Sequence, residues 1–221
     1  MEHTLRLVLV GDTRAGKTAL LRQFCEGGEL LVPLDPPPPT TGVDFKTCRV
    51  MLTHPVSGLP VQAKLNIWDA SGHPRHATVA AKFLTELHGA LCVYDVTNPA
   101  SLRAAIAWSR SVRQASPLAA CTLVGTKRDL RFAAAGAGVS RMEGEAVAQR
   151  LRAAAFCEVS AESADEVTAL FMRAAQAGLE RSLPALLPPP PVPTTALLPR
   201  GEDEDEDEDR SAFCRSMCIV S

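Results

Sequence analysis

The feature that most constrains this chain is residues 11–18, which read Gly-Asp-Thr-Arg-Ala-Gly-Lys-Thr. They match the phosphate-binding loop (P-loop) pattern G-x-x-x-x-G-K-[ST] at every fixed position. The apolar run 5–10 predicts a buried strand before the loop, and residues 19–24 predict the start of a helix after it. Because glycine lets backbone N–H groups turn inward and a helix N-terminus attracts anions, this context predicts a phosphate site. The alternative is a glycine-lysine turn without a ligand.

Two side chains of the P-loop suit phosphate chemistry. Lys17 is expected to reach the outer phosphates, and the Thr18 hydroxyl to ligate Mg²⁺. The other positions expected to surround a nucleotide here are Gly11, Asp12, Thr13, Arg14, Ala15, Gly16 and Ala19.

A length of 221 residues suits one domain with an appendage, and 46% hydrophobic residues are enough for a core. Residues 1–201 carry 21 basic and 17 acidic side chains, hence +4, whereas residues 202–221 carry 2 and 8, hence −6. Neither this balance nor the 5% aromatic content suggests nucleic-acid binding. No apolar run is long enough to span a bilayer, and no signal peptide is expected before the first strand.

The seven cysteines lack C-x-x-C spacing, so zinc and redox-motif interpretations have little support. We expect buried thiols in a reducing cytosol. The five that lie mostly in apolar runs are Cys25, Cys48, Cys92, Cys121 and Cys157.

Predicted strands and helices alternate after the P-loop. Residues 43–53 and 61–68 predict two strands joined by a turn. Further strands are predicted at 90–96, 119–124 and 156–159, and helices at 75–87, 99–115, 142–155 and 165–182. The alternation predicts parallel pairing with right-handed crossovers, to which the hairpin adds one antiparallel edge strand. The fold class is therefore α/β, a mostly parallel six-stranded sheet with helices on both faces.

Each further polar motif follows a predicted strand, where ligands of such sheets bind. Asp69 is expected to hold Mg²⁺ through a water, and the Gly72 N–H to meet a γ-phosphate. A turn-forming Asp-to-Gly segment is the alternative.

The segment Thr126-Lys127-Arg128-Asp129 suits guanine. The Asp129 carboxylate can accept two N–H bonds from guanine N1 and N2, while Lys127 lays its methylene stem over the base. Ser160 is expected to support Asp129, and Ala161 to offer a backbone N–H to guanine O6. A charged loop at a helix start is the alternative.

In order and spacing, these four motifs resemble the Ras superfamily of small GTPases over about residues 4–182. Residues 40–46 and 94–98 look most like the Rab branch, whereas Thr126 before Lys127, in place of Asn, is more similar to the Rho branch. The resemblance implies a P-loop NTPase G domain at residues 1–182 that switches between GTP and GDP with bound Mg²⁺. Thr40 then falls in switch I, where its hydroxyl closes onto Mg²⁺ and its N–H meets the γ-phosphate. Exchange factors, activating proteins and effectors are implied partners through switch I and switch II.

Several positions depart from the family. His73 and Pro74 stand where Rab and Ras proteins carry Gln and Glu, and that Gln orients the attacking water. Because imidazole has a shorter hydrogen-bonding reach, we expect slow hydrolysis, although histidine can also position water. Thr13 would crowd an incoming arginine finger.

Switch I itself departs from the pattern. Residues 29–32 offer no aromatic ring to stack on guanine, and residues 36–39 are four prolines. These prolines either stiffen the segment or form a passive insertion.

Residues 183–221 form the second predicted region, a disordered tail. Residues 183–200 hold seven of the 17 prolines and predict an extended linker, and residues 202–209 are all acidic. The last four residues form a C-a-a-X box that favours farnesylation of Cys218, with Cys214 as the candidate for a second lipid. A prenyl transferase, a lipid-binding chaperone and a membrane surface are the implied partners. The implied location is the cytoplasmic face of a membrane, with a cytosolic pool.

Three functions fit these observations. The first is a membrane-anchored GTPase switch in vesicle traffic or signalling. The second is a GTPase-deficient scaffold that stays bound to GTP, and the third is an interaction module that binds no nucleotide. Intact Lys17, Thr18, Asp69 and Asp129 argue against the third.

Overall fold

The computed structural model of the chain describes residues 3–26, 43–72, 82–132 and 138–186. The chain divides into two units, Met1–Leu187 and Pro188–Ser221, and all of the described residues belong to the first.

A six-stranded sheet forms the centre of the first unit, in the order β2-β3-β1-β4-β5-β6. All neighbouring strands are parallel except β2 and β3, which pair antiparallel from Val43 opposite Ala70 to Thr53 opposite Pro60. This confirms the predicted fold class. The strands are β1 His3–Gly11, β2 Val43–Thr53, β3 Pro60–Ala70, β4 Gly89–Asp95, β5 Ala120–Thr126 and β6 Ala155–Glu158.

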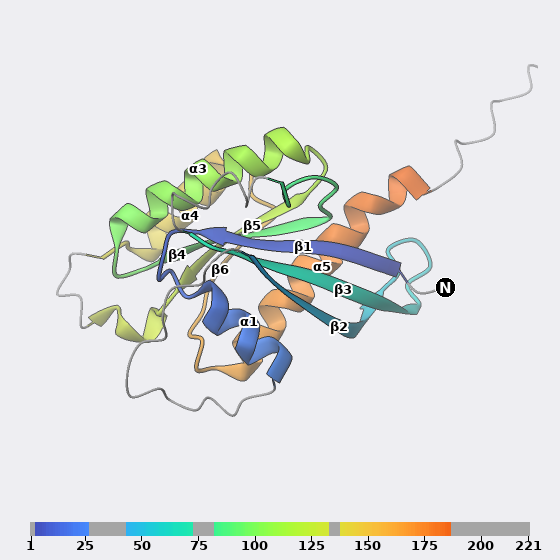
Figure 1. The fold of residues 1–221 in the computed structure, drawn as a ribbon, viewed down its shortest axis with the longest axis horizontal. Coiled ribbons are helices and arrows are strands. Elements are labelled where there is room, and N and C mark those ends of the chain that lie inside the picture. The colour runs from blue at the N-terminus through green and yellow to red at the C-terminus, as the bar shows by residue number, and fades with distance from the viewer. Residues whose placement is uncertain (1–2, 27–42, 73–81, 133–137, 187–221) are drawn as a thin grey trace, which may run out of the picture. The chain divides into compact units, whose positions relative to one another are not determined.

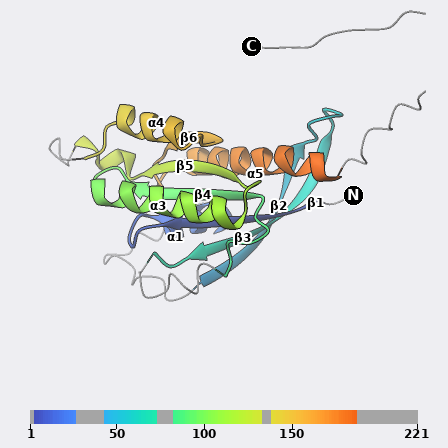
Figure 2. The same cartoon turned by 90° about the horizontal axis from the view of Figure 1, so that it is seen from above.

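Helices cover both faces of the sheet (Figures 1 and 2). Helices α1 and α5 pack on one face, around Leu20, Leu65 and Phe171, and α3 and α4 pack on the other, around Tyr94, Ala105 and Val147. The helices are α1 Lys17–Glu26, α3 Pro99–Ala115, α4 Arg141–Arg150 and α5 Ala164–Leu186, with a short 3₁₀ helix η2 at Arg128–Leu130. None of the described helices is long and apolar enough to cross a membrane.

Capping residues set the start of two helices. The Asn98 side chain accepts a hydrogen bond from the Ala100 N–H at the start of α3, and Pro99 follows at the first helical position. Ser140 and Glu143 form a reciprocal capping box at the start of α4. These local signals explain why α3 matches its predicted bounds.

Other boundaries differ from prediction. Helix α4 ends at Arg150, before the predicted residue 155, because Arg152 takes a left-handed conformation at φ 48° and Ala154 N–H bonds to Cys121 of β5. Helix α5 runs to Leu186, past the predicted end at 182, and so into the region predicted as tail.

The predicted helix at 75–87 is wrong in its described part. Residues 82–87 form turns in which Glu86 has φ 55° and the Leu87 N–H donates to Ser116. Residues 75–81 lie outside the described residues.

Candidate nucleotide-binding site

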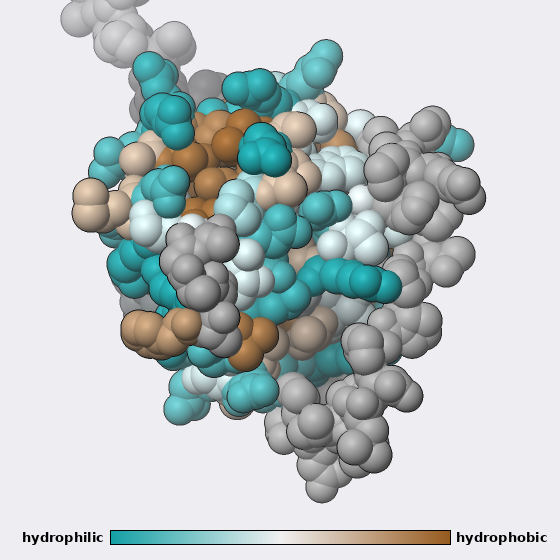
Figure 3. All heavy atoms as spheres, turned by 90° about the vertical axis from the view of Figure 1, so that its left-hand side faces the viewer, coloured by the Kyte–Doolittle hydropathy of each residue, from teal (hydrophilic) through white to brown (hydrophobic). Residues whose placement is uncertain are grey.

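The predicted site residues that the structure describes lie at one edge of the sheet, where the parallel strands end. Gly11 ends β1, Asp69 lies at the end of β3, Thr126 ends β5, and Ser160 follows β6. Figure 3 faces this edge, and hydrophilic residues occupy much of its middle. Parallel pairing therefore brings together motifs that are far apart in the sequence.

The P-loop backbone needs its glycines. Gly16 has φ +89°, in the left-handed region that glycine adopts without strain. Gly11 has φ +150°, and a Cβ there would lie 2.1 Å from the carbonyl oxygen of Val93 on β4. The loop consequently lies close against the sheet.

Lys17 is the buried cation of the loop. Only 6% of the residue is exposed, and its Nζ donates to the carbonyl oxygens of Gly11 at 3.1 Å and Asp12 at 2.7 Å. Burial lowers the pKa of Lys17, although the carboxylates of Asp69 and Asp12 act in the opposite direction. An anion bound in the loop would therefore add negative charge beside this ammonium and favour its protonated form.

Asp69 is fully buried beside Thr18. The Thr18 hydroxyl donates to Asp69 Oδ2 at 2.5 Å, while Oδ1 has no hydrogen-bond partner among the described residues. Burial raises the pKa of Asp69, opposed by the Thr18 hydrogen bond and by the charge of Lys17.

This pair fits Mg²⁺, which prefers carboxylate and hydroxyl oxygens together with waters and phosphate. The described residues contain no group of three or more His, Cys, Asp or Glu side chains that could hold a metal ion. Asp69 and Thr18 are the candidate ligands that the described residues offer at this point.

Gly72 packs directly on the P-loop. A Cβ at this position would lie 2.3 Å from the Asp12 carbonyl carbon and 2.4 Å from Thr13 N. Only glycine lets the segment after β3 approach the loop so closely. His73 and Thr40, the other predicted residues of this region, lie outside the described residues.

Thr126 connects the P-loop to the segment 126–129, which is predicted to bind guanine. Its buried hydroxyl donates to the Ala15 carbonyl at 2.7 Å and lies 3.0 Å from the Tyr94 carbonyl oxygen. A residue predicted to bind nucleotide thus also fixes the position of the loop.

Lys127 is held by a residue that the sequence analysis did not single out. It has φ 57°, and its Nζ contacts Asp95 Oδ2 at 2.6 Å. Asp95 Oδ1 accepts hydrogen bonds from the N–H and hydroxyl of Thr97. Burial raises the pKa of Asp95, but the bonds from Lys127 and Thr97 outweigh it and leave the pKa lowered.

Glu166 connects the segment 126–129 to Ser160. It accepts from Arg128 at 2.5 Å and from the Ser160 N–H at 3.1 Å, while Arg128 N–H also reaches the Val159 carbonyl. The Ser160 hydroxyl accepts from the Glu162 N–H, and Asp129 is exposed on η2. Ser160 therefore positions its loop through Glu166 and Glu162.

Asp95 and Glu166 were not among the predicted site residues. Asp95 pairs in register with Thr126, so the position of both residues at strand ends was a usable signal. Glu166 is in the first turn of α5. Because an acidic residue there also stabilises the helix N-terminus, the sequence offered no separate sign that Glu166 links Arg128 to Ser160.

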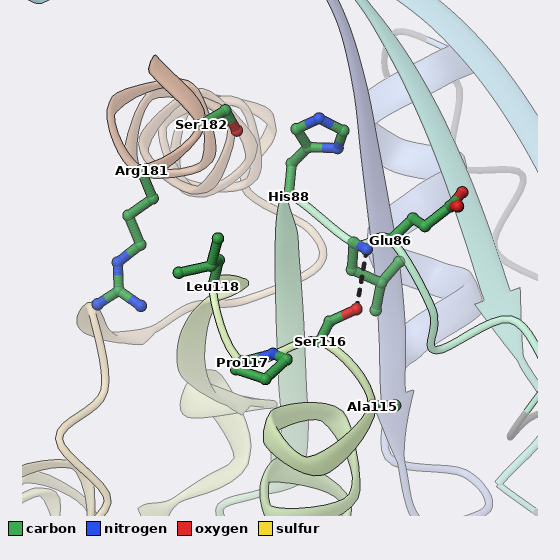
Figure 4. Close-up of a pocket in the computed structure, with 9 residues that line it drawn as sticks. Glu86, His88, Ala115, Ser116, Pro117, Leu118, Arg181 and Ser182 are labelled. Atoms are coloured by element: carbon green, nitrogen blue, oxygen red, sulfur yellow. Dashed lines mark hydrogen bonds between the residues drawn. The ribbon is translucent and has the colours of Figure 1, made fainter. Parts of the chain in front are cut away.

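A pocket of about 410 Å³ lies elsewhere, at the edge of the sheet where β4 and β5 begin. Figure 4 shows His88, Ser116, Leu118 and Arg181 around it. Burial and the nearby Arg6 lower the pKa of His88. None of the predicted nucleotide-site residues lines this pocket.

Comparison with known proteins identifies relatives along most of the chain. A family model described as the Ras family matches residues 6–180. Ras-related protein RIC1 of Oryza sativa subsp. japonica is 34% identical over 172 residues, 77% of this chain and 78% of its own length. Ras-related protein Rab-42 of Mus musculus is 34% identical over 185 residues, 80% and 81% of the two chains. Ras-related protein Rab-12 of Rattus norvegicus is 27% identical over 217 residues, 90% and 82%.

Proposed function

Because this chain belongs to the Ras family of small GTPases, with a Rab-like character, we propose that it is a membrane-anchored switch that binds Mg²⁺–GTP or GDP and hydrolyses GTP slowly. The observation that carries this proposal is the pair of buried, incompletely compensated charges at the strand ends. Lys17 has only carbonyl partners, and Asp69 Oδ1 has none among the described residues.

The phosphate end of the site comprises the P-loop, Asp69 and Gly72. The P-loop backbone and Lys17 bind the phosphates, and Asp69 and Thr18, with Thr40 from switch I, hold the metal. A Mg²⁺ ion held by these residues would supply positive charge beside the phosphoryl oxygens. The Gly72 N–H orients the terminal phosphate, so the chain acts mainly by placement and charge.

The guanine end comprises Thr126, Lys127, Asp129, Ser160 and Ala161. Because Asp95 holds the ammonium of Lys127, only the methylene stem is available to lie against a base. The exposed Asp129 carboxylate accepts the two N–H groups of guanine, and Ala161 N–H donates to O6. Adenine presents the opposite donor pattern, so this end selects guanine.

Replacing Asp129 tests base selection. Asp129→Asn should lower GTP affinity by about 100-fold, the cost of about two hydrogen bonds to a charged group, and should abolish the preference over ATP. Asp165→Asn, an exposed acidic change in the first turn of α5, is the matched control. Equal GTP affinity in both variants would contradict the assignment.

Hydrolysis is proposed to be slow because His73 replaces the water-orienting Gln. In single-turnover assays with Mg²⁺, His73→Gln should exceed the wild-type rate, which we expect to be at or below about 10⁻⁴ s⁻¹. Equal rates would remove the role assigned to His73. No turnover in the wild type, with GTP retained, would instead favour the GTPase-deficient scaffold. Absence of any nucleotide from purified, folded protein would favour the interaction module.

Regulators and effectors are proposed to contact switch I, switch II and the start of β2. Phe45 is 48% exposed and packs against Trp68, with ring centroids 5.1 Å apart. An aromatic pair beside the nucleotide edge, in which Phe45 is exposed and Trp68 is partly buried, suits a partner that distinguishes the two nucleotide states.

The region after the G domain is proposed as a tether. Prenylation of Cys218, aided by a second lipid on Cys214, would hold the chain on the cytoplasmic face of a membrane, after transfer by a prenyl transferase and a lipid-binding chaperone. Mass spectrometry of protein from eukaryotic cells should find the lipid on the wild type and none on Cys218→Ser. An unmodified wild-type terminus would overturn the proposed anchor.

A further inference from the structure

An arginine-rich surface lies at the edge of the sheet opposite the nucleotide site, where β4, β5 and β6 begin. Arg113, in the last turn of α3, donates from Nη2 to the carbonyl oxygens of Leu151 and Arg152. Arg181, near the end of α5, donates from Nη1 to the carbonyl oxygen of Ala119 at 3.1 Å. These bonds bring arginines from three segments of the chain to the start of β5.

Acidic side chains near this surface already have partners. Residues 96–128 and 146–157 contain no Asp or Glu. Glu86 lies at the same edge, but its carboxylate forms an ion pair with Arg6 at 2.7 Å. Glu180 on α5 accepts a hydrogen bond from a glutamine one turn earlier. Among the residues that the structure describes, the exposed arginines of this edge that form no ion pair are Arg150, Arg152 and Arg181.

An exposed apolar loop lies beside the arginines. Pro117 and Leu118 lie between α3 and β5, and 69% of Leu118 is exposed to solvent. Leu118 and Arg181 line one pocket of about 410 Å³, and Figure 4 shows both side chains there. A leucine beside arginines suits the membrane interface, because the apolar side chain buries between lipid headgroups while guanidinium groups bind lipid phosphate.

We propose that this arginine-rich edge is the face that the protein turns toward an anionic membrane. Arg150, Arg152 and Arg181 bind the phosphate groups of anionic lipids, and Leu118 enters the headgroup layer. The nucleotide site lies at the other ends of the same strands, so it faces away from the bilayer. Regulators and effectors then reach the nucleotide edge without obstruction by lipid.

The proposed lipid anchor alone does not select this face. The inference rests on the proposed function, in which a lipid on Cys218 holds the chain on a membrane. The 31 residues between Leu186 and Cys218 have a maximum span of about 100 Å, so the anchor permits many orientations of the G domain. Anionic lipid repels the acidic run 202–209, so electrostatic attraction has to come from another part of the chain.

Vesicle binding of the full chain tests the proposal. A hexahistidine tag after Ser221 tethers the protein to vesicles that contain a nickel-chelating lipid, so the test does not need prenylation. The vesicles otherwise consist of phosphatidylcholine, with or without phosphatidylserine. With phosphatidylserine, Arg152→Gln/Arg181→Gln should raise the apparent dissociation constant by about 25-fold, which is about fivefold for each arginine. Without phosphatidylserine, the variant should match the wild type.

Two single variants separate the contributions to binding. Arg150→Gln should raise the dissociation constant by about fivefold. Its side chain forms no hydrogen bond among the described residues, so this variant still tests the proposal if loss of the Arg181 bond to Ala119 disturbs folding. Leu118→Gln should raise the dissociation constant by about threefold, because this side chain leaves water only in part.

The matched control is Arg103→Gln/Arg173→Gln, which removes the same charge from exposed positions in the first halves of α3 and α5. It should change the dissociation constant by less than about twofold, because these positions lie about a Debye length or more from the bilayer. Hydrogen–deuterium exchange then locates the contact. In the tethered wild type, the amides of residues 114–119 should exchange more slowly when phosphatidylserine is present.

Equal binding of the wild type, Arg150→Gln and Arg152→Gln/Arg181→Gln to phosphatidylserine vesicles would overturn the proposal. So would an equal loss of binding in the control, because net charge alone would then explain the result. Protection from exchange at β2 instead of residues 114–119 would assign the membrane to another face. An unmodified Cys218 in cells would count against the proposed anchor and leave the vesicle result unaffected, because the nickel-chelating lipid supplies the tether.

Discussion

The phosphate end and the guanine end of the site differ in how their polar groups are satisfied. Among the described residues of the phosphate end, the Lys17 ammonium donates only to carbonyl oxygens, and Asp69 Oδ1 accepts no hydrogen bond. At the guanine end, Thr126 bonds to Ala15, Lys127 pairs with Asp95, and Glu166 links Arg128 to Ser160.

This difference predicts which residues contribute mainly to ligand affinity and which contribute mainly to the stability of the fold. Buried charges without full compensation cost stability, and a ligand that completes them recovers that cost. Internally satisfied groups stabilise the fold and keep the surface proposed to bind guanine in one conformation. Variants at the phosphate end should therefore affect affinity more than stability, and variants at the guanine end that break internal bonds should do the reverse.

Lys17→Ala should show the largest effect. Loss of charge-assisted bonds to phosphate should weaken GDP binding by about 100-fold or more, while the free energy of unfolding without nucleotide should stay the same or rise. Calorimetric titration and urea denaturation measure the two quantities. Arg110→Ala, on the exposed face of α3, is the control and should change neither. A destabilised variant with normal affinity would reverse the comparison.

Gly72→Ala should come next. The added Cβ meets P-loop backbone, so we expect a loss of about 1–3 kcal/mol in the free energy of unfolding together with weaker GDP binding. Gly58→Ala is matched, because Gly58 has φ +69° and open space around it. It should cost about 1 kcal/mol from backbone strain alone and leave binding unchanged. Normal GDP binding by Gly72→Ala would show that the close approach is dispensable.

Thr126→Val should affect the fold more than the affinity. The isosteric change removes the buried hydroxyl and leaves the Ala15 carbonyl without that donor, at about 1–2 kcal/mol in the free energy of unfolding. Thr47→Val removes an exposed hydroxyl that contacts Asn66 and should cost under about 0.5 kcal/mol. Denaturation curves that coincide for the two variants would contradict the structural role of Thr126.

Asp95→Asn should give the smallest effect, and its signature is a weaker loss of stability on acidification. Because the folded-state pKa of Asp95 is lowered, its ionised form contributes stability above the ordinary aspartate pKa of about 3.9, and this is lost as pH falls through the folded pKa. The variant should lack about 1 kcal/mol at neutral pH and lose less stability on acidification. Lys127→Met should behave alike. Parallel acid profiles for wild type and both variants would remove the proposed coupling.

The sequence predicted the sheet because local signals and topology agree. Strand-loop-helix alternation and the turn at Gly58 imply parallel strands with one hairpin, and the P-loop pattern fixes where the ligand edge lies. The early end of α4 was not predictable, because it depends on Ala154 bonding to Cys121 of a neighbouring strand.

Side-chain partners within the site were less predictable than its location. A threonine at position 126 suggested contact with nucleotide, yet its hydroxyl bonds to the Ala15 and Tyr94 carbonyls, which only the packed sheet brings within reach. Lys127 likewise offered no sign of Asp95, which lies 32 residues away in sequence. Such pairs depend on strand register, which the sequence pattern constrained only loosely.

The most direct test is calorimetric titration of nucleotide-free protein with GDP and with ADP, each with Mg²⁺. The account predicts a GDP dissociation constant of about 1 µM or below and ADP binding about 100-fold weaker or undetectable. Equal affinity for the two nucleotides, or no binding of GDP by folded protein, would contradict the assignment of a guanine-nucleotide site to the carboxyl edge of the sheet.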